Sequence, residues 1–192
     1  MSMKAGRWQY WRHRVQAMVW LVAGRAERAL EAYSAMLCLW PNDAYALASR
    51  SHVLAQLGRR DDAIADAQAL VTRHPQRSAA DWFNLAFLLE TAGQLDAAEH
   101  AFRSAVALDP NLDRAWYGLG LVLIRMQRLD EAVKALKRNT ELQPMSPYGW
   151  YQLARIHVDR REPDEARRII GHLKEFEPKI AAQLERETGL IA

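Results

Sequence analysis

Apolar residues recur at steps of three and four along short segments of the chain, with polar residues between them. The segment 81–89 reads DWFNLAFLL, and this spacing is typical of an α-helix. Gly93 then stands where helices commonly end. A second segment, 95–108, is rich in alanine and is followed by Asp109 and Pro110. We therefore expect two helices joined by a tight turn, with small alanine side chains that let them approach closely.

The same pattern returns along the chain at a nearly constant interval. Trp82, Trp116 and Trp150 are 34 residues apart, and the prolines follow at intervals of 34 or 35 residues, at Pro41, Pro75, Pro110, Pro144 and Pro178. A single hairpin cannot bury its apolar face, whereas stacked hairpins bury a continuous core. We therefore expect one cooperative domain of five repeats, which span residues 10–43, 44–77, 79–112, 113–146 and 147–180. A basic, aromatic segment, residues 1–9, would precede them, and residues 179–192 would form a capping helix and tail.

These repeats resemble the tetratricopeptide repeat (TPR), whose pattern is Trp-x2-Leu-Gly-x2-Tyr, then Ala-x3-Phe-x2-Ala, then Pro. The third repeat supplies Trp82, Leu85, Ala86, Leu89, Ala98, Phe102, Ala105 and Pro110. Other repeats depart from the pattern at single positions: Arg50 stands at a leucine position, Asn139 at the last alanine, and His13 at the first tryptophan. The resemblance covers residues 10–180. It implies an all-α, right-handed α-solenoid of antiparallel helix hairpins, with the periodic tryptophans buried between helices.

The composition is that of a globular protein, and it offers no set of residues for catalysis. Half of the residues are hydrophobic, and 26 Lys and Arg balance 23 Asp and Glu. The single cysteine, Cys38, excludes a disulfide framework, and we expect it to be a small buried hydrophobe. The sequence contains no phosphate-binding loop and no HExxH or GxSxG motif, and its six histidines lack metal-ligand spacing. We therefore expect no enzymatic activity, no cofactor and no metal.

The resemblance also implies where a partner binds, because the first helices of TPR arrays line a concave groove. The groove positions carried onto this chain are Phe83, Asn84, Phe87, Arg114, Tyr117, Leu121, Arg125, Tyr148, Tyr151 and Arg155. Aromatic residues and arginine dominate interface hot spots, and arginine pairs with carboxylates. We expect a protein or peptide segment with apolar anchor residues and some acidic residues. The alternative is that aromatics such as Phe83 and Tyr117 pack between neighbouring first helices.

One special form of this groove holds the C-terminal carboxylate of a chaperone. It uses a Lys/Asn, Asn, Lys/Arg set across three successive repeats. In this chain only Asn84 and Arg114 match, and Ala48 and His52 stand at the upstream positions. The sequence therefore argues against a carboxylate clamp of this kind.

The N-terminal residues combine basic and aromatic side chains, among them Arg7, Trp8, Trp11, Arg12 and Arg14. Such a strip suits nucleic acid, an anionic membrane surface or a protein. Residues 79–112 carry five acidic groups and one basic group, which would interrupt a track for phosphates and argues against nucleic acid. The apolar stretch 15–24 has about half of the ~20 residues that a membrane span needs. We expect no membrane span, a cytoplasmic protein, and a second contact site at this strip.

These observations favour a non-catalytic protein-interaction scaffold or assembly adaptor that holds a partner segment in its groove. Two alternatives stay open. In the first, the protein is structural and self-assembles into a homo-oligomer, with the first repeat or the cap of one copy meeting another copy. In the second, it is a regulatory subunit of a catalytic partner.

Overall fold

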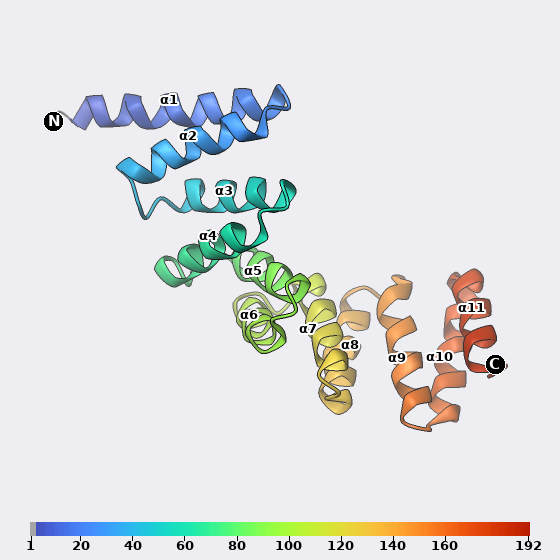
Figure 1. Ribbon diagram of the computed structural model, residues 1–192. Helices are drawn as coiled ribbons and strands as arrows, with labels where there is room; N and C mark the ends of the chain where they lie inside the picture. Colours follow the sequence, from blue (N-terminus) through green and yellow to red (C-terminus); the bar gives the residue numbers. More distant parts are fainter. Residues whose placement is uncertain (1–2) are drawn as a thin grey trace. The chain divides into compact units, whose positions relative to one another are not determined.

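Every regular element in the described part of the chain is a helix. The computed structural model describes residues 3–192, with side chains from residue 6 onward (Figure 1). The helices are α1 (Met3–Val22), α2 (Ala26–Leu39), α3 (Ala44–Gln56), α4 (Arg60–Arg73), α5 (Ala79–Thr91), α6 (Leu95–Leu108), α7 (Asp113–Arg125), α8 (Leu129–Leu142), α9 (Pro147–Asp159), α10 (Pro163–Phe176) and α11 (Pro178–Thr188). The expected all-α fold class is confirmed. Residues 3–9, expected to precede the first repeat, form the first turns of α1.

The helices gather into two compact units, one ending at Gln94 and the other spanning Leu95–Ala192. In the N-terminal unit, each helix from α1 to α4 packs against the next helix along the chain. The same holds for α6 to α11 in the C-terminal unit, where α11 also packs against α9. The repeat boundaries and the single cooperative domain remain predictions.

Local residue choices explain where several helices begin. The Asp43 carboxylate accepts a hydrogen bond of 2.7 Å from the backbone N–H of Ala46, and this caps the first turn of α3. Ser78 caps α5 in the same way, because its hydroxyl accepts a 3.1 Å bond from the Ala80 N–H. Prolines start α9, α10 and α11, where their fixed backbone suits the first helical position. The sequence thus sets these boundaries locally.

Small residues let the helices of each unit approach closely. One alanine is fully buried near the start of each second helix: Ala29, Ala63, Ala98, Ala132 and Ala166. In the C-terminal unit, a Cβ atom placed on Gly118 of α7 would overlap the ring of Phe102 of α6. Larger side chains at these positions would force the helices apart.

The periodic tryptophans lie at the edge of this core, half-buried rather than buried as expected. Each donates its indole N–H to the backbone carbonyl of a proline in the loop before its helix, at 2.9 Å: Trp82 to Pro75, Trp116 to Pro110 and Trp150 to Pro144. An indole N–H needs such an acceptor when its ring is largely covered. The shared period of tryptophan and proline therefore reflects a bond between them.

Candidate binding site

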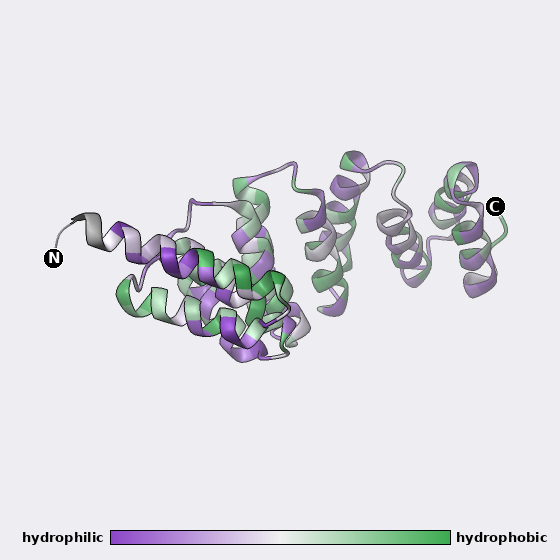
Figure 2. Cartoon of the chain, turned by 90° about the horizontal axis from the view of Figure 1, so that it is seen from above, coloured by the Kyte–Doolittle hydropathy of each residue, from purple (hydrophilic) through white to green (hydrophobic). Residues whose placement is uncertain are grey.

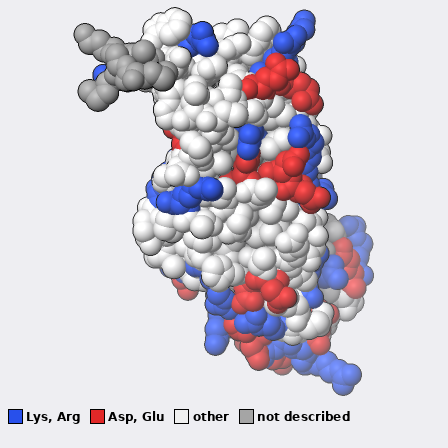
Figure 3. Space-filling model, turned by 60° about the vertical axis from the view of Figure 1, so that its left-hand side comes forward, with Lys and Arg blue, Asp and Glu red and all other residues white. Residues whose placement is uncertain are grey.

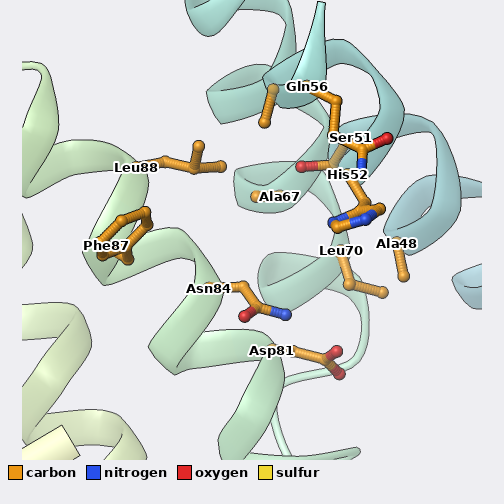
Figure 4. Close-up of a pocket in the computed structure, with 11 residues that line it drawn as sticks. Ala48, Ser51, His52, Gln56, Ala67, Leu70, Asp81, Asn84, Phe87 and Leu88 are labelled. Carbon is orange, nitrogen blue, oxygen red and sulfur yellow. The ribbon is translucent and has the colours of Figure 1, made fainter. Parts of the chain in front are cut away.

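A pocket of about 320 Å³ opens among the helices α3, α4 and α5 of the N-terminal unit (Figure 4). It is lined mainly by small and apolar side chains, together with a few polar ones: Ala48, Ser51, His52, Ala55, Gln56, Ala67, Leu70, Asp81, Asn84, Phe87 and Leu88. The alanines of α3 and α4 leave the space, and Phe87 and Leu88 of α5 form its opposite wall. The pocket can therefore take an apolar group.

Two of the polar residues in the pocket already have partners. The Ser51 hydroxyl donates to the backbone carbonyl of Ala63 at 2.8 Å. The carboxylate of Asp81 accepts two hydrogen bonds from the Arg77 guanidinium, at 2.7 and 2.8 Å. Because their polar atoms are engaged, these residues leave the interior of the pocket largely apolar.

His52 and Asn84 differ from this pair. Both are exposed, and in the described part of the chain neither side chain forms a hydrogen bond or ion pair. Figure 4 shows them on facing sides of the pocket, His52 on α3 and Asn84 on α5. An asparagine amide both donates and accepts hydrogen bonds, which matches a backbone amide. The rim of the pocket therefore offers neutral polar groups to a ligand.

The structure brings together some of the groove residues expected from the sequence. Asn84 and Phe87 line the pocket, and the Phe87 side chain is 52% exposed. Phe83, on the same helix, is half-buried and is not part of the lining. The contribution of the alanines of α3 and α4 could not be predicted from the sequence, because the pocket forms only where small residues on two helices face a third helix.

The other expected groove residues lie on α7 and α9 of the C-terminal unit. The rings of Tyr117 and Tyr148 meet edge to face, with 6.5 Å between their centroids, so they connect successive first helices. Arg114 and Arg125 are exposed on α7, and Leu121 is half-buried. Helix α7 thus carries both a tyrosine that contacts the next first helix and two exposed arginines.

Tyr151 and Arg155 of α9 already contact a carboxylate of the chain itself. The Tyr151 hydroxyl donates to Glu187 of α11 at 2.7 Å, and the Arg155 guanidinium lies 4.0 Å from the same carboxylate. Hydrogen bonds from Gln183 and Tyr151 lower the pKa of Glu187 below its usual value. The role of Glu187 could not be predicted from the sequence, because the capping helix lies outside the repeat pattern.

Comparison with known proteins identifies the family. Two sequence models described as tetratricopeptide repeat match residues 49–113 and 89–151, which together span more than half of the 192 residues. The chain belongs to the tetratricopeptide repeat family. A search of curated proteins finds no match.

Solved TPR structures share the fold at low sequence identity. The crystal structure of MamA protein is 22% identical, with a TM-score of 0.81 over 94% of each chain. YrrB, described as a TPR protein with an unusual peptide-binding site, is 20% identical, with a TM-score of 0.78 over 88% of each chain. A tetratricopeptide repeat protein from Parabacteroides merdae is 19% identical, with a TM-score of 0.81 over 94% of this chain and 74% of the other. These likenesses establish the TPR fold.

TPR proteins are generally non-catalytic and bind other proteins. Between residues 3 and 192, no group of three or more His, Cys, Asp or Glu residues is placed to hold a metal ion. Cys38 is exposed, not buried as expected. Across the same range, none of the helices combines the length and apolar character that a membrane crossing requires.

Proposed function

We propose that this TPR protein is a non-catalytic scaffold that holds a segment of a partner protein on its first helices, with one apolar side chain of the partner in the pocket among α3, α4 and α5. The observation that carries the proposal is the open, apolar pocket with a half-exposed Phe87 on its wall. Burial of this surface by an aliphatic or aromatic side chain is favourable, at roughly 25 cal/mol per Å² of apolar area. Asn84 and His52 would hydrogen-bond the partner backbone at the rim.

The charges near the other groove residues support a partner that also carries acidic residues. Arg114, Arg125 and Arg155 are exposed, and Arg155 lies near a carboxylate in the chain itself. On the face shown in Figure 3, basic and acidic side chains stand next to one another over much of the charged surface. Mixed charge of this kind fits a protein segment better than a nucleic acid strand, which needs a continuous basic track.

The pocket can be tested by filling it. A library of displayed random peptides would be selected against the full chain, and the selected peptides are expected to share one large apolar residue. Replacement of Ala55 by Leu puts a larger side chain into the pocket. Leucine also favours the helical conformation, so α3 should stay intact. The Ala55→Leu variant should bind a selected peptide about tenfold or more weakly, because the apolar residue loses its site. Fluorescence anisotropy with the labelled peptide measures the change.

A matched control is the same replacement at Ala182, which is exposed on α11. Ala182→Leu should bind the peptide as the wild type does, and circular dichroism should show equal helical content in both variants. Equal affinity of Ala55→Leu and wild type would refute the proposed pocket. Tyr151 and Arg155 serve less well as test positions, because their replacement also removes contacts to the capping helix.

A further inference from the structure

Helix α1 carries apolar residues on two opposite faces, and α2 covers only one of them. On the covered face, Ala17 is fully buried and the ring of Tyr10 meets that of Trp40, with 5.3 Å between centroids. The opposite face carries a row of residues whose exposed fractions run from 51% to 91%: Trp8, Trp11, Val15, Met18 and Val22. We call this row the α1 stripe. Soluble helices that are apolar on both faces are normally covered on both.

The spacing of the α1 stripe is that of a helix-pairing seam. Its members follow at steps of three, four, three and four residues, which is the heptad spacing of positions that pack helix against helix. The helix has 20 residues, whereas α3, α5, α7 and α9 each have 13. A shallow hollow at Trp8, Trp11, Arg12, Val15 and Gln16 supplies a place for a side chain from a facing helix. Figure 2 shows hydrophobic residues, coloured green, along the C-terminal half of α1.

We infer that the α1 stripe is the contact between two copies of this chain, with the two α1 helices antiparallel. The orientation follows from the charges of α1. Arg7, Arg12 and Arg14 all lie before residue 15, and residues 15–22 carry no charge. A parallel pair would place the same arginines side by side.

An antiparallel pair separates these charges. It places Arg12 and Arg14 of each α1 beside the uncharged residues 15–22 of the other, close to its C-terminal carbonyls, which carry partial negative charge. In the usual layers of such a pair, Trp11 meets Val22 of the second copy and Val15 meets Met18 of the second copy. The stripe is thus complementary to itself under a two-fold axis, as an interface between identical copies must be.

A second copy fits this surface better than a membrane does. An interfacial helix keeps its cations on the face away from its apolar residues. Here the guanidinium of Arg12 lies over the ring of Trp8, at 5.3 Å, and that of Arg14 lies between the rings of Trp11 and Tyr45, at 5.1 and 4.0 Å from their centroids. The charges therefore border the apolar row itself, as residues that flank a helix-pairing seam do.

Sedimentation velocity of the full chain over a concentration series tests the inference, because it measures the mass of the protein in solution. The wild type should sediment as a dimer that dissociates on dilution. Met18→Lys places a charge within the seam, beside the arginines of the second copy, and should weaken dimerisation about tenfold or more. Gln9→Lys adds the same charge on the same helix, at a residue outside both the stripe and the hollow, and should leave the dimer intact. Circular dichroism should show that both variants keep their helices.

The orientation is tested by cross-linking in a Cys38→Ser background, where cysteine stands only at the chosen position. A mixture of Val15→Cys and Met18→Cys chains should form disulfides faster than either variant alone, because the antiparallel layers place residue 15 opposite residue 18. A parallel pair would cross-link each variant with itself. The inference is overturned by a monomer at all concentrations, by a Met18→Lys variant that dimerises like the wild type, or by a monomer that binds phosphatidylglycerol vesicles through the stripe.

Discussion

At the scale of single residues, Arg50 shows how the chain accommodates a departure from its family pattern. The guanidinium stands at a leucine position and makes a two-pronged ion pair with the buried carboxylate of Asp66, with both contacts at 2.7 Å. A third bond of 3.2 Å reaches the hydroxyl of Ser34. The hydrogen bonds to Asp66 raise the pKa of Arg50 further, against the effect of its burial. The ion pair thus allows Arg50 and Asp66 to occupy positions between helices where an unpaired charge would be costly.

A double-mutant cycle at this pair should therefore be strongly non-additive. Asp66→Ala leaves the half-buried Arg50 without its partner and should lower the free energy of unfolding by about 2 kcal/mol. Arg50→Leu combined with Asp66→Ala should return to within about 1 kcal/mol of the wild type, because no charge is then left unpaired. Urea unfolding followed by circular dichroism gives these values. The exposed pair Arg28 and Glu31, at 3.5 Å, is the control and should show a coupling close to zero.

At the scale of the helix hairpin, the turns between paired helices contain a residue with positive φ, which is glycine in some turns and a residue with a side chain in others. Gly58 and Gly93 adopt it with φ near 76° and 78°, whereas Gln127 and Arg161 adopt it with φ of 61° and 59°. This left-handed region costs roughly 1–2 kcal/mol for residues with a Cβ atom. The last two turns therefore hold strain that the others do not.

Replacement of Gln127 or Arg161 by glycine should stabilise the protein. We expect each change to raise the free energy of unfolding by about 0.5–1 kcal/mol, since the relief of strain exceeds the entropy that glycine adds to the unfolded chain. Thermal and urea unfolding measure this gain. The reciprocal change Gly58→Gln should cost a similar amount, because nothing lies within 4 Å of an added Cβ there and only the backbone conformation opposes it. A stabilising Gly58→Gln would contradict the explanation.

The hairpins also show what a repeat pattern reveals and what it leaves out. The segment 95–108, expected to be a helix from its alanines and its closing proline, is α6. Depth in the core was less predictable: Trp82 is half-buried because its N–H must reach Pro75, and Cys38 lies on the exposed side of α2. The pocket beside Phe87 depends on alanines of two other helices. The residue pattern within one helix does not show which residues of other helices will face it. The groove residues themselves remain predictions.

At the scale of the whole molecule, the chain should lose stability in acid through carboxyl groups of its C-terminal unit. Glu99 and Glu131 share the guanidinium groups of Arg103 and Arg128 through four contacts of 2.5 to 2.8 Å. Two of these contacts, Arg103 to Glu131 and Arg128 to Glu99, join α6 to the start of α8. Burial raises the pKa of Glu99, but hydrogen bonds from the two arginines outweigh it and hold the pKa below 4.5. A hydrogen bond from Arg128 likewise lowers the pKa of Glu131 below its usual value.

The sign of the pH effect follows from these lowered pKa values. Because the folded carboxyls hold protons less tightly than the unfolded ones, their contribution is complete above about pH 4.5. It is lost as the pH falls from there through the folded pKa values. The double variant Glu99→Gln and Glu131→Gln should therefore be less stable than the wild type at pH 7, and this difference should shrink as the pH approaches 3. Urea unfolding at a series of pH values measures both curves.

A control separates this network from ordinary surface charge. Asp164 pairs with Arg167 on the exposed side of α10, and Asp164→Asn should change the stability at pH 7 only slightly, because exposed ion pairs contribute little. A constant gap between the Glu99→Gln, Glu131→Gln variant and the wild type down to pH 3 would mean that the network stabilises by its packing and not by its charge. Convergence of the two curves assigns that part of the acid sensitivity to the carboxylates that join α6 to α8.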